Sequence, residues 1–559
     1  MKKLYFILLV LVGIACKNDP NVNYEDVVLW EPYNDSAEVA ANQDHENTRM
    51  RYKLIQSRVL DKNEVFRPLY KEVSRFSEAE YDSLKPLILE QDIPTIQLHV
   101  ASGELSYEKL VLFYLYRIYK YELDNATTLN TVIALNADVV EEAREKDREI
   151  EENPDLLQNP LFGMPVLLKD NINTKGMRTT AGAIALENNE NTEDAFIVSR
   201  LKSNGALILG KVNLSEWAYF FCGGCPVGYS AIGGQTLNPY GRRVFETGGS
   251  SSGSGTSVAA NYAVAAIGTE TSGSILSPSG QNSVVGLKPT IGLLSRTGIV
   301  PISSTLDTPG PMTRNVVDNA ILLGALTGKD PADAKSVDVN MDYLSGILEG
   351  SVLRGKRLGV FAPLMESDSV YASTVEKLKE MGAEVFSFTP PEVQMNGFST
   401  LLNIDMKYDL PAYISTQVKD TQAVKVRNVL DVVAFNKKDT LLRMPYGQAR
   451  LEGILSDSTT LEELEVIKLN LEKNGRLFFD QAMEEFQLDA VLSINNYHAG
   501  YAAVAKYPAL TVPMGYRETG EPVSLTFIAK PFEEDKLLQL GYAFEQATKA
   551  RKAPEMYNE

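Results

Sequence analysis

The residues from Gly223 to Gly280 constrain the fold more than any other part of the chain. This segment is rich in glycine and serine and poor in charge, a composition that alone is typical of a flexible linker. It also contains the apolar runs Val258–Ala260 and Tyr262–Ile267, which a linker would lack. Glycine permits close approach and unusual backbone conformations. We therefore expect a buried segment whose main-chain amides build a site.

Helical and strand-like patterns alternate on both sides of this segment. Helices are predicted at 108–121 (with Ser106 as N-cap), 137–152, 195–203 and 370–381, and mostly helical structure at 391–485. Short apolar strands are predicted at 165–168, 206–209, 357–361, 385–388, 490–494 and 509–513. This alternation predicts a fold of the α/β class.

Charge and residue counts exclude several classes of function. The net charge of −19 repels phosphate backbones, so we expect no nucleic-acid partner. The chain has three cysteines and three histidines, and both are scattered. Scattered ligands oppose a zinc site built from His and Cys. A hydrolase that uses a Ser-His-Asp triad would have few histidines to choose from.

The amino terminus has the pattern of a signal peptide. A basic start is followed by an apolar run from Leu4 to Ala15, which is too short to span a bilayer. The run ends in small residues before Cys16 and resembles a bacterial lipobox, with Gly13 where leucine is usual. We expect a signal peptide over 1–16, export to the cell envelope, and a lipid anchor at Cys16 on a bacterial membrane, on its periplasmic or its surface face. The alternatives are ordinary cleavage after Ala15 and an uncleaved anchor.

The next 51 residues, 17–67, are polar and are predicted as a tether leading into the first helices, before one large domain over 68–559. Two cysteines remain for that domain, Cys222 and Cys225 in a Cys-Gly-Gly-Cys sequence. Outside the cytoplasm such a pair can oxidise to a disulfide. The alternative is two small residues in a glycine-rich loop.

Three short motifs combine the residue types of a hydrolase. Lys169 directly follows the predicted strand at 165–168, although a buried ammonium is costly unless it is paired or neutralised. Taken alone, it is better explained as a strand-end lysine that reaches solvent. Gly248–Gly255 and Gly268–Ser274 are both rich in serine, and each alone is compatible with a polar turn.

Together the three motifs resemble the amidase signature family, and most closely its peptide amidase branch. Further matching segments are Gly210–Trp217, Gly234–Pro239, Gly286–Thr290, Asp307–Met312 and Pro508–Pro513. The resemblance runs from about residue 75 to the carboxyl terminus. It implies a mixed β-sheet covered by helices on both sides. It also implies hydrolysis of a small-molecule or peptide amide to an acid plus ammonia or amine, without metal or cofactor.

The resemblance assigns a role to each motif residue. Ser274 would be the nucleophile that forms an acyl-enzyme. Ser250, after a cis peptide bond from Gly249, would connect Ser274 to Lys169. Burial would keep Lys169 neutral so that it serves as the general base. The oxyanion hole would be formed by the main-chain N–H groups of Thr271, Ser272, Gly273 and Ser274. Ser272 departs from the family, which more often has glycine or aspartate there.

Other functions fit fewer of the residues. Gly249–Gly253 matches the nucleophile elbow of α/β-hydrolases, which would make the chain an esterase using Ser251 and His498. The sequence from Gly205 to Val212 nearly matches a phosphate-binding loop but lacks its Ser or Thr. A surface lipoprotein that keeps the fold and only binds a ligand would not need all three motif residues. The signal peptide and the charge both oppose the tRNA-linked amidotransferase subunit that shares this fold.

Overall fold

The computed structural model describes residues 24, 27–339, 341–350 and 352–558. The predicted signal peptide and its Cys16 lie outside these residues, so export and lipidation stay predictions. No helix in the described ranges has both the length and the apolar character needed to cross a membrane.

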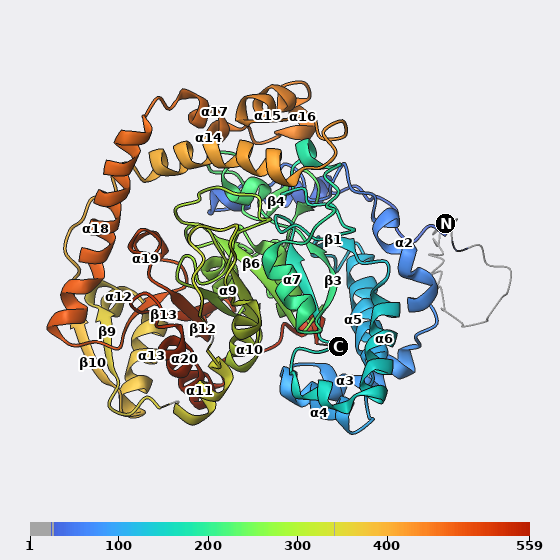
Figure 1. Cartoon of the computed structure of the whole chain (residues 1–559), viewed down its shortest axis with the longest axis horizontal. Coiled ribbons are helices and arrows are strands. Elements are labelled where there is room, and N and C mark those ends of the chain that lie inside the picture. Colours follow the sequence, from blue (N-terminus) through green and yellow to red (C-terminus); the bar gives the residue numbers. More distant parts are fainter. Residues whose placement is uncertain (1–23, 25–26, 340, 351, 559) are drawn as a thin grey trace, which may run out of the picture.

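An 11-stranded mixed sheet forms the centre of the molecule (Figure 1). In spatial order its strands are β1 (Val132–Leu135), β3 (Leu207–Val212), β2 (Pro165–Lys169), β6 (Ala265–Glu270), β8 (Thr308–Thr313), β7 (Val285–Lys288), β12 (Ala509–Tyr516), β13 (Pro522–Ile528), β11 (Ala490–Ile494), β9 (Arg357–Phe361) and β10 (Glu384–Phe388). Strand β2 lies between β3 and β6 and is parallel to both. A separate pair joins β4 (Tyr229–Ser230) to β5 (Gly234–Gln235). The predicted strands at 165–168, 357–361 and 490–494 are confirmed.

Helices pack against this sheet and complete the predicted α/β fold. Those that follow or contact its strands are α7 (Phe196–Ser203), α8 (Ser252–Ala259), α9 (Leu276–Gln281), α10 (Val316–Leu326), α11 (Tyr343–Gly350), α12 (Ala362–Ser367), α13 (Ser369–Glu380), α19 (Ala499–Ala505) and α20 (Glu534–Thr548). Short 3-10 turns lie at Thr48–Met50, Pro154–Gln158, Ile184–Leu186, Glu216–Tyr219 and Glu555–Tyr557. The buried side chains of strands and helices form one large apolar core.

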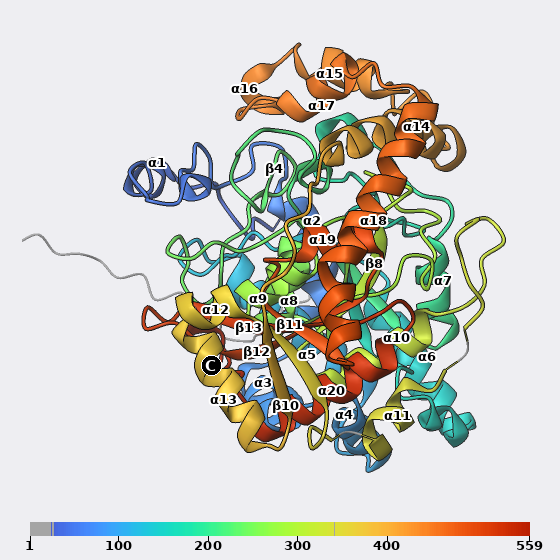
Figure 2. The ribbon, with the colours of Figure 1, turned by 90° about the vertical axis from the view of Figure 1, so that its left-hand side faces the viewer.

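Amino-terminal helices flank the β1 end of the sheet (Figure 1). They are α2 (Lys62–Val73), α3 (Glu78–Ile88), α4 (Ile93–Ala101), α5 (Tyr107–Glu122) and α6 (Val139–Glu152). The short α1 (Ser36–Ala41) lies apart from them (Figure 2). Ser106 caps α5, because its side chain accepts a hydrogen bond from Lys109 N. The predicted helix at 108–121 and its predicted cap are therefore confirmed.

A second group of helices lies above the sheet, and the last of them runs down to the level of β9 and β10 (Figures 1 and 2). It consists of α14 (Phe398–Gln417), α15 (Val429–Asn436), α16 (Thr440–Arg443), α17 (Ala449–Ser456) and the long α18 (Leu461–Glu485). A capping box between Thr460 and Glu463 starts α18. Apolar side chains of α14, α15, α17 and α18 share one cluster with Trp217, Phe220 and the cysteine pair. This group thus packs on the segment between β3 and the serine-rich motif.

The glycine- and serine-rich segment is buried, as predicted. Every residue of α8 is buried, because its small side chains let the backbones of neighbouring segments approach closely. A Cβ added to Gly253 would lie 2.5 Å from Asn213 O, and one added to Gly255 would lie 2.9 Å from Pro278 O. Larger residues at either position would separate α8 from the loops that surround the motif.

The segment 27–61 is part of the packed body, where the sequence predicts a polar tether. Trp30, Met50 and Ile55 are buried, and Ile55 O accepts a hydrogen bond from Gln235 N at 2.9 Å. The buried apolar residues are dispersed among polar ones without helical or strand periodicity. The polar composition of the segment therefore gave no indication of the contacts that these few apolar residues make.

Candidate active site

Lys169 ends strand β2 in the middle of the sheet and is fully buried. Its Nζ donates to Ser250 Oγ at 2.8 Å, to Thr269 Oγ1 at 2.8 Å and to Thr269 O at 3.1 Å. The side chain does not reach solvent, so the explanation of a strand-end lysine pointing outward is wrong. Strand β2 lies between the parallel strands β3 and β6, and the partners of Nζ come from Thr269 in β6 itself and from the Ser250 turn.

Burial lowers the pKa of Lys169 to about 7, because removal from water disfavours the ammonium form. The negative charges of Asp307 and Glu270 raise the pKa and oppose this shift. With a pKa near neutrality, both protonation states of Lys169 are populated at pH 7. An amine that is neutral in part and hydrogen-bonded to a hydroxyl can accept that hydroxyl's proton.

Ser250 lies in a tightly enclosed turn before α8. Its side chain is fully buried, and the peptide bond from Gly249 is cis, as the family resemblance implies. Ser250 O accepts a hydrogen bond from Ser215 N at 3.0 Å. A Cβ added to Gly249 would lie 2.6 Å from both Ser215 Oγ and Val227 Cγ1. The segment after β3 therefore fixes the position of the hydroxyl that Lys169 contacts.

Ser274 lies in the loop that follows β6, next to the Ser250 turn. Ser274 O accepts a hydrogen bond from Ser251 N at 3.2 Å, which joins the two serine motifs. Ser274 is partly exposed, whereas Lys169 and Ser250 are fully buried. The structure thus brings the three predicted residues to one place and leaves Ser274 as the member that solvent reaches.

The carboxylate of Glu270 organises the loop between β6 and α9. It accepts hydrogen bonds from Gly273 N at 2.7 Å, Ile275 N at 2.7 Å and Leu276 N at 3.0 Å. Sequence reasoning assigned no role to Glu270, although it lies inside the Gly268–Ser274 motif. Because Gly273 N–H already donates to Glu270, it differs from the other three N–H groups predicted for the oxyanion hole.

The other three N–H groups predicted for the oxyanion hole are not engaged as Gly273 N–H is. Within the described ranges, the main-chain N–H groups of Thr271, Ser272 and Ser274 donate to no protein acceptor. The side chain of Thr271 is held separately, since its Oγ1 donates to Asp307 Oδ1 at 2.5 Å. A loop with fixed side chains and unengaged N–H groups is suited to hold a developing negative charge on a ligand oxygen.

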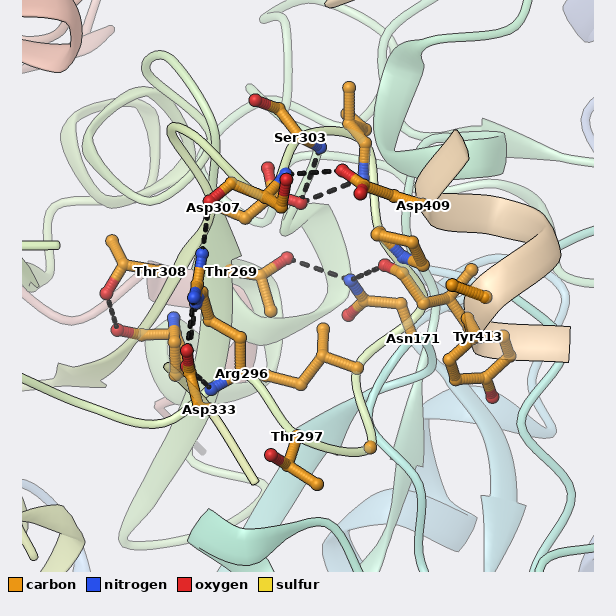
Figure 3. A pocket seen from close by; sticks show the side chains of 18 of the residues that line it. Asn171, Thr269, Arg296, Thr297, Ser303, Asp307, Thr308, Asp333, Asp409 and Tyr413 are labelled. Carbon is orange, nitrogen blue, oxygen red and sulfur yellow. Dashed lines mark hydrogen bonds and ion pairs between the residues drawn. The ribbon is translucent and has the colours of Figure 1, made fainter. Parts of the chain in front are cut away.

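Further residues around Lys169 complete the site. Thr269 Oγ1 also accepts a hydrogen bond from Asn171 Nδ2 at 3.0 Å. Asn171, Thr269, Thr271 and Asp307 all line a cavity of about 500 Å³ (Figure 3). Thr271 was predicted as an oxyanion donor, and Thr269 and Asp307 lie in matched segments, so the sequence offered a signal for all three. Asn171 follows Lys169 by two positions and carried no separate signal.

The residues of the alternative functions are engaged elsewhere. Ser251 Oγ donates to Thr269 O at 3.0 Å. The ring of His498 stacks on Phe361 at 4.0 Å, and its Nδ1 lies 2.6 Å from Ser493 Oγ. The segment resembling a phosphate-binding loop is strand β3, whose Lys211 is buried 3.4 Å from Asp170. No part of this arrangement favours the elbow or the phosphate-binding alternative.

The cysteine pair is oxidised in the structure. Cys222 and Cys225 form a disulfide in the loop between Ser215 and the Ser250 turn. Both side chains are buried in the apolar cluster that includes Trp217 and the helices α14 and α17. Of the two alternatives that the sequence left open, the structure has the disulfide.

Comparison with known proteins gives matches over most of the chain. A family model described as Amidase matches residues 109–494. A probable amidase of Arabidopsis thaliana is 38% identical over 484 residues, which cover 84% of this chain and 92% of the relative.

Solved structures match over a similar range. An amidase family protein from Bacillus anthracis has a TM-score of 0.83 and 36% identity, over 89% of this chain and 99% of its own. The native peptide amidase from Stenotrophomonas maltophilia has a TM-score of 0.78 and 38% identity, over 83% of this chain and 98% of its own.

Proposed function

The chain belongs to the amidase signature family and is an amide hydrolase, and from this premise we propose that it works through an acyl-enzyme on Ser274. One observation carries the proposal: the fully buried Lys169 donates to Ser250 Oγ at 2.8 Å, beside the loop that contains Ser274. This is the geometry that a lysine needs to act in place of a histidine, with a hydroxyl as the proton relay.

The first half of the reaction forms the acyl-enzyme. Ser274 Oγ attacks the carbonyl carbon of the amide, and its proton passes to Ser250 Oγ while the Ser250 proton passes to neutral Lys169. The carbonyl oxygen becomes an oxyanion, which the N–H groups of the Thr271–Ser274 loop stabilise. One such donor contributes roughly 3–4 kcal/mol to lowering the barrier. The same relay in reverse protonates the amide nitrogen as the C–N bond breaks, releasing ammonia or amine.

The second half regenerates the enzyme. A water molecule attacks the acyl carbon and gives one proton through Ser250 to Lys169. The ester bond to Ser274 then breaks, the relay returns that proton to Ser274 Oγ, and the acid is released. An oxyanion forms in both halves of the reaction. Of the predicted donors, the N–H groups of Thr271, Ser272 and Ser274 are best suited to stabilise it, because they donate to no described protein acceptor. Gly273 N–H is held by Glu270, and its contribution is to keep the loop in shape.

For the substrate, we propose a peptide with a carboxyl-terminal amide. The support is the likeness to a peptide amidase at 38% identity over nearly its whole length. The test is ammonia release from a panel of amidated peptides and of simple aliphatic and aromatic amides. We expect the amidated peptides to have the highest kcat/KM. A panel led by simple amides would overturn this assignment and leave the chemistry intact.

The catalytic assignment is tested by Ser274→Ala. We expect kcat to fall by at least about a thousandfold while the melting temperature stays the same. Ser254→Ala is the matched control, because Ser254 is also buried in the serine-rich segment but donates to Ile267 O, away from Lys169. Wild-type turnover by Ser274→Ala would end the proposal.

The amino-terminal sequence supports a separate proposal, export and attachment of lipid to Cys16 in the cell envelope. The disulfide between Cys222 and Cys225 agrees with an oxidising compartment.

A further inference from the structure

A cavity of about 500 Å³ opens beside Lys169 (Figure 3). Asn171 and Thr269 form part of its wall, and Thr269 Oγ1 also accepts the hydrogen bond from Lys169 Nζ. The cavity therefore adjoins the proposed proton relay through one shared side chain. Its far wall comes from α14, which contributes Asp409 and Tyr413.

Asn171, which lines this cavity, has a buried acceptor without a hydrogen-bond partner. Its Nδ2 donates to Thr269 Oγ1 at 3.0 Å and to the carbonyl oxygen of Val300 at 3.4 Å. A carbonyl oxygen only accepts, so the amide cannot be turned round. Asn171 Oδ1 consequently has no hydrogen-bond partner, although the residue is only 2% exposed. A buried acceptor left in this state is stabilised by a ligand that brings an N–H or O–H donor.

The wall also carries negative charge that no described residue pairs. Asp307 Oδ2 accepts from the N–H groups of Ile302 at 2.8 Å and Ser303 at 2.9 Å, and Asp409 Oδ2 accepts from Ser304 N at 2.6 Å. Both carboxylates thus accept hydrogen bonds from the same three-residue segment, Ile302–Ser304. Within the described ranges neither forms an ion pair with a lysine or arginine.

The nearby cations are occupied by other groups. Arg296, on the wall, is bonded to Asp333, with Nε 2.8 Å from Asp333 Oδ2. Lys335 donates to the carbonyl oxygens of Ser304 and Thr305. Burial raises the pKa of Asp409 to about 6, and the charges of Asp405 and Asp307 add to this effect. A cation bound in the cavity would relieve this repulsion.

We propose that this cavity binds a primary ammonium group. An ammonium offers three donors and a positive charge, which match the acceptor of Asn171 and the carboxylates of Asp307 and Asp409. The cavity is far larger than one ammonium ion, since a water molecule occupies about 30 Å³ in the liquid. The ligand is therefore an organic amine in its protonated form.

Such an amine has two sources, and this part of the inference rests on the proposed function. Because a carboxyl-terminal amide releases only ammonia, the ammonium belongs either to the acyl part of the peptide, as a lysine side chain or an amino terminus, or to a free amine that binds the cavity independently of the substrate. Both sources present the same chemistry to the cavity, so the binding site is tested first and the source second.

The binding test uses n-butylammonium and the uncharged n-butanol as probes of equal size, titrated by calorimetry into the Ser274→Ala enzyme. We expect the ammonium to bind at least tenfold more tightly than the alcohol. Asp409→Asn should weaken ammonium binding at least tenfold. Glu465→Gln, which removes one negative charge from an exposed site on α18, should leave it unchanged.

Two results would overturn the proposal. One is equal binding of the alcohol and the ammonium, and this comparison holds even if Asp409→Asn does not fold. The other is unchanged ammonium binding by a folded Asp409→Asn enzyme, with folding checked by its melting temperature. The titration needs no turnover, so its result does not depend on the proposed function. The proposed function is tested separately and fails if Ser274→Ala hydrolyses amides like the wild type.

The source is resolved with two carboxyl-terminally amidated peptides of equal length, one that carries a lysine and one that carries the uncharged norleucine at the same position. A bound substrate ammonium predicts at least tenfold higher kcat/KM for the lysine peptide than for the norleucine peptide, and loss of this difference in Asp409→Asn. A free amine predicts equal kcat/KM for the two peptides and inhibition by n-butylammonium that Asp409→Asn relieves. Absence of both patterns contradicts the proposal.

Discussion

Thr269 Oγ1 lies 2.8 Å from Lys169 Nζ and 3.0 Å from Asn171 Nδ2, so one hydroxyl joins the proposed general base to the cavity beside it. Thr269 is the penultimate residue of β6, and its carbonyl oxygen also accepts from Lys169. The position of Lys169 Nζ is therefore fixed by Thr269, at the end of β6, as well as by Ser250.

The pH dependence of kcat/KM should follow the protonation of Lys169. Its pKa is lowered to about 7 by burial, and only the neutral amine accepts a proton. Activity is therefore expected to be low in acid and to rise through about pH 7 with unit slope. The profile should be measured with a substrate that does not titrate. A flat profile from pH 5 to 9 would contradict the role of the lysine.

Thr269→Val tests the hydrogen bond between Lys169 Nζ and Thr269 Oγ1. Valine keeps the shape of threonine and removes the oxygen that accepts from Lys169. Loss of an acceptor from a charged group favours the neutral form, so the acid limb of the profile should move to lower pH. Thr269→Ser retains the oxygen and is the matched control. An unshifted limb in the valine variant would mean that this hydrogen bond does not tune the lysine.

Glu270→Gln tests the carboxylate that organises the loop before Ser274. The amide keeps one acceptor but places an NH₂ group against the main-chain N–H groups that now donate to it. Loss of such hydrogen bonds costs about 1–3 kcal/mol. We expect a lower melting temperature and a kcat reduced at least tenfold, with a smaller change in KM. A variant with wild-type kcat would show that the shape of the loop does not depend on Glu270.

The disulfide is expected to contribute modestly to stability. Its loop is short, with a sequence separation of 3, and loop closure of that size is worth about 2 kcal/mol in the chain-entropy account. Dithiothreitol should lower the melting temperature of the wild type. The double variant Cys222→Ser and Cys225→Ser should melt lower without reductant and not respond to it. If dithiothreitol lowered the melting temperature of both proteins equally, its effect would not come from reduction of this disulfide.

Lipidation predicts that labelled palmitate is incorporated into the full chain in a bacterial host and that the protein fractionates with membranes. Cys16→Ala should abolish both, since the thiol carries the lipid. Cys222→Ser is the control that keeps Cys16. Labelling that persists in Cys16→Ala would overturn the anchor.

Local signals in the sequence were sufficient for much of the fold. The apolar run before Lys169 and the periodic helix ending at Glu122 are recognisable because side-chain alternation and helical spacing are properties of neighbouring residues. The family resemblance supplied the cis bond before Ser250 and the grouping of the motifs. The segment around Trp30 and Ile55 was misjudged because its contacts are made with residues far along the chain.

The amino-acid sequence by itself determined the α/β class, the family and the identity of Lys169, Ser250 and Ser274 as the residues to examine. Only the tertiary structure decided that Glu270 holds Gly273 N–H, that the cysteines are bonded, and that Asn171, Asp307 and Asp409 face one cavity. The physical reason is that hydrogen bonding, burial and charge pairing depend on distance in space. Those three cavity residues come from three separate segments that meet only when the sheet and α14 have packed together.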